Sequence, residues 1–130
     1  MNEADLKFYN AWAELLGWLR EYADQSESAR FVKQADFTEY IYRMARPYEL
    51  PTTIGSASLS DAADNPVLLL SASPRHAVFK EVVLHPFDSH VYRHLTLAAD
   101  GSGLVEGNRN FTRQLLFDLA DRLFRVPTPA

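Results

Sequence analysis

The feature that most constrains this fold lies between residues 65 and 126, where short apolar segments separated by turn residues precede one amphipathic stretch. Each segment has the length of a β-strand and ends at glycine, proline, serine or aspartate, which favour turns. The predicted strands are 67–70, 77–84, 90–98 and 104–106. Because the connections between them are short, we expect a four-stranded antiparallel meander.

The last apolar stretch predicts a helix that covers one face of this sheet. After Gly107 and Asn108, we expect Asn110 to cap the helix, and Pro127 to end it. The residues of its apolar stripe recur every four positions: Phe111, Leu115, Leu119 and Leu123. Such a wide stripe is typical of a helix that is buried along one side.

The first half predicts two further helices. Apolar residues recur at helical spacing across 3–23, at Phe8, Trp12, Leu15, Leu19 and Tyr22. Trp18 falls outside this stripe. A second helix is expected from 29 to 46, where Asp36 and Glu39 resemble a capping box and Pro47 stops the helix.

Residues 48–64 show no periodicity and predict a long loop, of the kind that is usually functional or mobile. Together these elements predict one α+β domain over residues 1–130, with a helical half at 1–47, a loop at 48–65, and the sheet with its helix at 66–126. The two N-terminal helices and the C-terminal amphipathic helix are expected to pack on one face of the four-stranded meander.

Composition excludes several classes of protein. The chain has no cysteine, which excludes disulfides and thiolate ligands and fits a reducing cytoplasm. Its net charge of −4 leaves no strongly basic face, so nucleic acid is not an expected partner. No apolar run reaches the ~18 residues of a membrane span, so we expect a cytoplasmic protein without membrane contact.

Four histidines lie within nineteen residues, and they raise the possibility of a metal site. If 77–84 and 90–98 form a hairpin, His85 and His90 face each other across it, with Asp88 in the turn. Two imidazoles and a carboxylate can bind a divalent cation. The alternative interpretation is that exposed histidines are ordinary at turns, and we expect no cofactor.

No nucleophile elbow or phosphate-binding loop is present, so the sequence favours a non-enzymatic protein. Tyrosine and tryptophan are frequent in interfaces, and the candidate partner-binding residues are Trp18, Tyr48, Tyr92, His94 and Thr96. The leading hypothesis is a protein-binding or regulatory module of bacterial or phage origin, such as an adaptor, chaperone, immunity protein or inhibitor. Two alternatives are a small enzyme or metal-binding protein using the hairpin histidines, and a small-molecule sensor with residues 48–64 as its lid.

The first predicted strand also suggests an oligomeric state. Residues 67–70 are apolar and uncharged, and as a bare sheet edge they would promote aggregation. A second copy of the chain is one cover for such an edge, because twofold dimers are the commonest oligomers. We therefore expect a homodimer that also binds another, unidentified protein.

Overall fold

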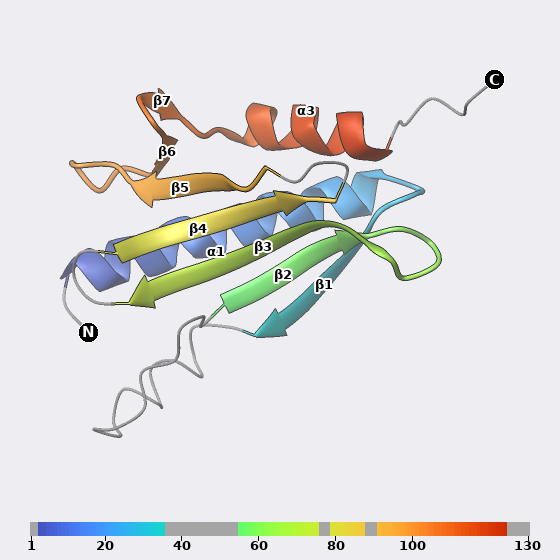
Figure 1. The fold of residues 1–130 in the computed structure, drawn as a ribbon, viewed down its shortest axis with the longest axis horizontal. Helices are drawn as coiled ribbons and strands as arrows, with labels where there is room; N and C mark the ends of the chain where they lie inside the picture. The colour runs from blue at the N-terminus through green and yellow to red at the C-terminus, as the bar shows by residue number, and fades with distance from the viewer. Residues whose placement is uncertain (1–2, 36–54, 76–78, 88–90, 125–130) are drawn as a thin grey trace.

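The computed structural model describes residues 3–35, 55–75, 79–87 and 91–124. In these residues it has two helices and one seven-stranded antiparallel sheet, so the α+β class is confirmed. The strands follow one another across the sheet in chain order, and α1 lies behind the sheet in the view of Figure 1. The helices are α1 (Glu3–Gln25) and α3 (Arg113–Phe124). The strands are β1 (Arg30–Ala35), β2 (Gly55–Ser60), β3 (Pro66–Arg75), β4 (Phe79–Pro86), β5 (Arg93–Leu97), β6 (Leu104–Glu106) and β7 (Arg109–Asn110).

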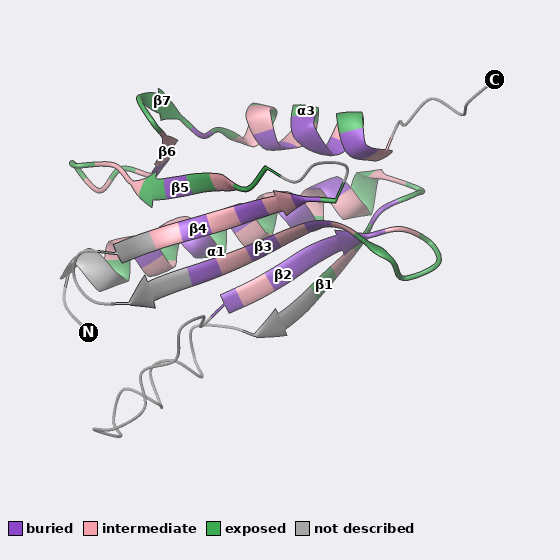
Figure 2. Ribbon diagram, viewed as in Figure 1, coloured by how far each residue is buried: buried purple, intermediate pink, exposed green. Residues whose placement is uncertain are grey.

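The core lies between one face of the sheet and the two helices. The predicted stripe of α1 is buried as expected, with Phe8, Leu15 and Leu19 fully inaccessible. Alternate residues of β3, β4 and β5 are buried against them, and they give the purple bands of Figure 2. This alternation leaves the other residues of each strand on the opposite face, which no helix among the described residues covers.

The last helix packs on the same core. Leu119 and three neighbours of its apolar stripe are buried, which confirms the predicted role of this helix. Its start differs from the prediction, because Asn110 lies in β7 and the helix begins at Arg113. The cap is Thr112, whose Oγ1 accepts a hydrogen bond of 3.2 Å from the N–H of Leu115.

Two pairs of polar side chains join the first and last helices. Arg113 of α3 donates hydrogen bonds of 2.9 Å and 2.5 Å to the carboxylate of Glu21 on α1. The Tyr22 hydroxyl donates a hydrogen bond of 2.9 Å to Asp121. The bonds from Arg113 hold the pKa of Glu21 below its ordinary value. The first and last helices are thereby fixed side by side.

The prediction of a second helix at 29–46 is wrong in its first part. Residues 30–35 form β1, and residues 36–46 lie outside the described residues. The predicted loop at 48–64 likewise contains β2, while 48–54 are not described. Both strands form through pairing with distant neighbours: Phe31 is opposite Leu59, and Leu59 is opposite Leu68. Local sequence carries little of this information, because strand preference depends strongly on context.

Strand β3 is longer than predicted, because the first predicted strand spans 67–70 whereas β3 runs from Pro66 to Arg75. Ala72, opposite Gly55, is the last residue of β3 with a described partner on β2. Beyond it, the ladder partner of Pro74 among the described residues is on β4 only, and a missing backbone N–H is tolerated at such a position. The sheet also gains the short β7, where the prediction had ended it at Gly107.

The predicted homodimer loses its physical basis here. The segment 67–70 lies within β3, which pairs with β2 on one side and β4 on the other. It is an interior strand and not a sheet edge. The strand that pairs with it on one side is β2, which lies within the predicted loop 48–64. Apolar residues on an interior strand create no exposed edge for a second copy to protect.

A charged pair fixes β6 beside β5. Arg93 donates from Nε and from a terminal nitrogen to the two carboxylate oxygens of Glu106, both at 2.7 Å. The guanidinium also lies 5.9 Å from the ring centre of Phe111. These hydrogen bonds hold the pKa of Glu106 below its ordinary value. The pair compensates for the shortness of β6, which contributes only three residues to the ladder.

We predict that Gly55→Ala destabilises the protein. A Cβ at this position would lie 2.9 Å from Cε2 and Nε1 of the buried Trp12 ring. Overpacking of this kind costs about 1–3 kcal/mol, and we expect a fall of several degrees in Tm. Gly103→Ala is the matched control, because nothing lies within 4 Å of its added Cβ. Equal melting temperatures for the two variants would contradict this packing.

We predict that the contribution of Glu106 to stability depends on pH. A carboxylate whose folded-state pKa is lowered stabilises the fold above its unfolded pKa, about 4.3, and this contribution is lost as the pH falls through the folded pKa. Glu106→Gln should cost about 0.5–1 kcal/mol at pH 7 and progressively less below about pH 4.3. Urea unfolding of both proteins between pH 7 and 3 measures this, and a constant difference at all pH values would refute it.

Candidate protein-binding surface

Exposed apolar side chains gather where β4 leads to β5. Among the described residues, five large hydrophobic side chains are strongly exposed, and three of them are at this connection. These are Phe87 at 48% exposure, Val91 at 68% and Tyr92 at 53%. Together with His85 at the end of β4 they form what we call the β4–β5 patch. Scattered exposed hydrophobics are ordinary, but a cluster is typical of an interaction surface.

The rings of the patch contact one another. The imidazole of His85 lies near two aromatic rings, with centre-to-centre distances of 4.6 Å to Phe87 and 4.4 Å to Tyr92, and each pair of rings is tilted. The backbone N–H of Phe87 donates a hydrogen bond of 3.0 Å to the carbonyl of Val67, which fixes the end of β4 against β3. The aromatic rings are therefore ordered before any partner binds, which reduces the entropy cost of association.

The patch continues into the uncovered face of the sheet. Leu95 of β5 is buried in the core, so its neighbours His94 and Thr96 point to the opposite face and are exposed. His94 Nδ1 lies 3.3 Å from Glu81 Oε2, across the β4–β5 pair. This polar area borders the apolar patch, as expected of an interface with an apolar centre and a polar rim.

The structure brings together only some of the predicted binding residues. Tyr92, His94 and Thr96 are all exposed and lie at the β4–β5 end and open face. Trp18 is on α1, in the other layer, and is partly buried against the core. Tyr48 lies outside the described residues. Sequence reasoning missed Phe87 and Val91, because Phe87 was assigned to a turn and Val91 to the core side of a strand.

Two of the three residues of the predicted metal site lie outside the residues that the structure describes, so the site stays a prediction. His85 contacts two aromatic rings, and Asp88 and His90 lie outside the described residues. The described residues contain no group of three or more histidine or carboxylate side chains placed to bind a metal. No helix among them is long and apolar enough to span a membrane.

Comparison with known proteins gives a match over nearly the whole chain. The family model described as NADH-quinone oxidoreductase chain 15 matches residues 3–126. NADH-quinone oxidoreductase subunit 15 of Thermus thermophilus is 49% identical over 119 residues, covering 92% of this chain and 91% of the relative. The chain belongs to the NADH-quinone oxidoreductase chain 15 family.

Membership of this family corrects the functional hypotheses. The expected free regulatory module is wrong, and so is the phage assignment, because the chain belongs to a family of NADH-quinone oxidoreductase chains. The homodimer is wrong for the same reason, in agreement with the interior position of β3. The broader expectation, that the partner is another protein, agrees with a family of subunits.

Proposed function

We propose that this chain is an accessory subunit of an NADH-quinone oxidoreductase, and that it attaches to another subunit through the β4–β5 patch. The observation that carries the proposal is the 49% identity with subunit 15 of Thermus thermophilus over 92% of this chain. At this level of identity over almost the full length, the surface that binds the rest of the assembly is expected to be shared.

The composition and topology support a role without electron transfer. Iron–sulfur clusters are held mainly by cysteine thiolates, and the sequence has no cysteine. Dinucleotides bind at the carboxyl ends of parallel strands in α/β folds, whereas all strand pairs described here are antiparallel. The described residues therefore supply neither of the usual redox sites, and we infer that the chain contributes through binding. The absence of cysteine also supports the cytoplasm as its location.

The chemistry of the β4–β5 patch suits this role. Tyrosine and other aromatic side chains supply much of the binding energy in interfaces, since they bury large areas with few rotamers to restrict. Tyr92 and Phe87 are half-exposed in the isolated chain, and ring contacts with His85 already restrain them. Burial of Phe87, Val91 and Tyr92 by a partner would remove the largest exposed apolar cluster among the described residues.

We predict that Val91→Ser/Tyr92→Ser weakens attachment to the oxidoreductase at least about tenfold, because two apolar contacts near the interface centre are lost. The test uses an affinity-tagged chain expressed in its native host in place of the untagged one. NADH-oxidising activity that co-purifies with the tag from a detergent extract is measured for the parent and the double variant.

Leu6→Ser is the matched control, because Leu6 is 50% exposed and lies on α1, away from the patch. The control should retain co-purification, and all three proteins should melt within about 2 °C of each other, since exposed substitutions seldom change stability much. A parent chain that purifies without any NADH-oxidising activity would refute the proposed function. Equal losses for the control and the double variant would refute the patch as the attachment surface.

A further inference from the structure

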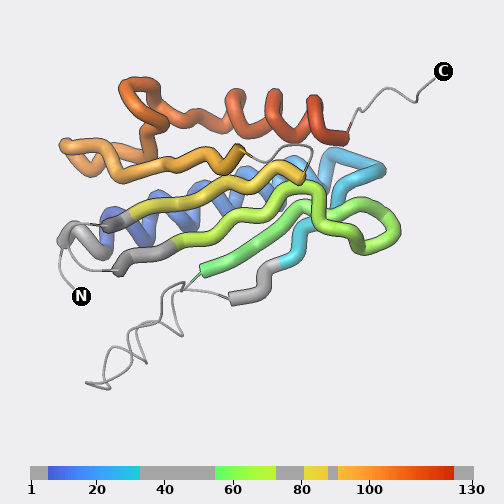
Figure 3. The backbone as a smooth tube through the Cα atoms, in the orientation of Figure 1, coloured from blue at the N-terminus to red at the C-terminus, as the bar shows by residue number. Residues whose placement is uncertain are grey.

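A groove lies at the end of the molecule beside the patch. Its volume is about 580 Å³, and it opens between the turn that joins β2 to β3, the junction of α1 with β1, and the last turn of α3. These segments lie at the same end of the chain trace in Figure 3, to the right. Its lining is formed by Glu27, Ser28, Asp61, Ala62, Pro66, Val67, Phe87, Leu123 and Phe124.

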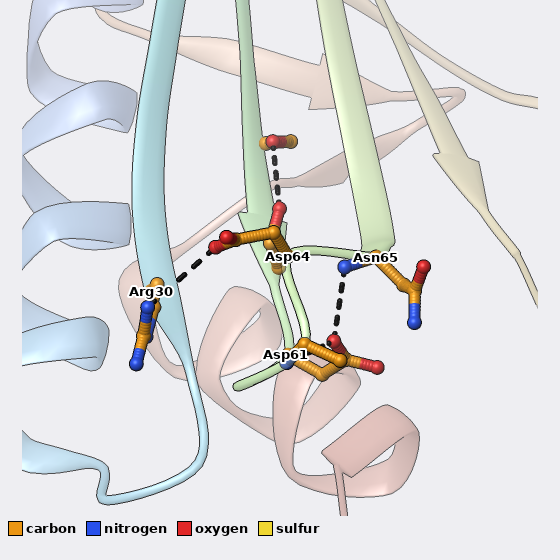
Figure 4. A network of polar contacts seen from close by, with 7 residues as sticks. Arg30, Asp61, Asp64 and Asn65 are labelled. Atoms are coloured by element: carbon orange, nitrogen blue, oxygen red, sulfur yellow. Dashed lines mark hydrogen bonds and ion pairs between the residues drawn. The ribbon is translucent and has the colours of Figure 1, made fainter.

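One wall of the groove is a turn with a defined conformation (Figure 4). Asp61 Oδ1 accepts hydrogen bonds of 2.9 Å from the N–H groups of both Ala63 and Asn65. Asp64 adopts a positive φ of 63° and forms an ion pair of 3.6 Å with Arg30 of β1. Aspartate tolerates this backbone conformation better than most residues. The wall is therefore formed in the isolated chain and does not need a partner to order it.

The opposite wall is apolar. Leu123 is buried in the core, and Phe124 packs partly against it, with its ring centre 6.1 Å from that of Tyr22. Val67 and Phe87 complete the apolar lining from the sheet. This apolar lining suits an apolar side chain of moderate size.

The charges of the lining have one sign. Glu27 and Asp61 contribute carboxylates, and the described lining residues include no lysine or arginine. The hydrogen bonds from Asn65 and Ala63 hold the pKa of Asp61 below its ordinary value, so this group is ionised at neutral pH. A second pocket, of about 380 Å³, shares Ser28 and Phe124 with the groove and contains the carboxylate of Asp121. An acidic rim around an apolar floor is complementary to a basic, partly apolar ligand.

Resting on the proposed function, we propose that this groove binds a segment of a neighbouring subunit that places an apolar side chain on Val67, Leu123 and Phe124 and an adjacent lysine or arginine on Glu27 and Asp61. Phe87 connects the two surfaces, because it belongs both to the lining of the groove and to the β4–β5 patch. The patch then supplies most of the apolar contact area, and the groove determines which basic segment is accepted.

The test uses variants in which the carboxylates of the groove are replaced by uncharged amides of similar shape. Glu27→Gln/Asp61→Asn removes both carboxylates, while the amide oxygen of asparagine can still accept the hydrogen bonds from Ala63 and Asn65. Asp64→Asn is the matched control, since it makes the same chemical change in the same turn but outside the groove lining. Asparagine also tolerates the positive φ at this position.

The fluorescently labelled chain is titrated into NADH-quinone oxidoreductase prepared from a native-host strain that lacks this chain. We expect the double variant to bind about fivefold more weakly than the parent at about 50 mM salt. The difference should shrink at about 500 mM salt, because exposed ion pairs are screened. The control should bind like the parent at both salt concentrations.

Equal binding of parent and double variant, or an equal loss in Asp64→Asn, would overturn the inference about the groove. If the parent binds and only Val91→Ser/Tyr92→Ser weakens it, the proposed function stands and the groove proposal fails. If the parent does not bind at all, both fail. Sedimentation velocity of the isolated chain provides one more outcome. A dimer that dissociates in Glu27→Gln/Asp61→Asn would assign the groove to a second copy of the chain and overturn the proposal.

Discussion

The burial of the α1 stripe is the interaction on which the rest of this structure depends. One helix of 23 residues lies against the sheet, and its buried side contacts strands from β1 to β5. Trp12 shows how closely the two layers approach, because its ring lies where a side chain at residue 55 would be, and only glycine leaves room. A single long helix organises several strands here, because contacts along its length reach all five of them.

Among the described residues, the two helices cover one face of the sheet and leave the other open, and this asymmetry favours the open face for a partner. On the covered face, contacts such as Arg113–Glu21 and Arg93–Glu106 satisfy the charged groups within the chain. On the open face and at the end of β4, aromatic and apolar side chains remain exposed. A subunit that functions by attachment needs such a surface, and a rigid scaffold lowers the entropy lost on binding.

Membership of a family of oxidoreductase chains is physically consistent with the proposed role without electron transfer. Electron transfer requires bound cofactors, and the ligands and folds that hold them are local and easily recognised. An accessory subunit needs only a stable fold and a complementary surface, which many sequences can provide. The family relationship is accordingly carried by similarity over residues 3–126 and not by a short motif.

The sequence determined the elements whose side chains repeat regularly over several turns or alternate along a strand. The stripe of α1, the burial of Leu119 on the last helix and the order of β3 to β6 follow from local periodicity. Histidine and threonine at 94 and 96 could likewise be assigned to the open face, because alternation about Leu95 is a local property.

Tertiary structure decided the remainder. The segment 55–60 is glycine, serine and alanine with one leucine, and it becomes a strand through pairing with β1 and β3, while Gly55 leaves room for the Trp12 ring. Residues 30–35 form a strand through pairing with residues 56–60, and not through their own preference. The patch and the groove both depend on Phe87, whose neighbours come from distant parts of the chain. Pairing and packing between segments far apart in sequence are set by the whole fold, and no local pattern encodes them.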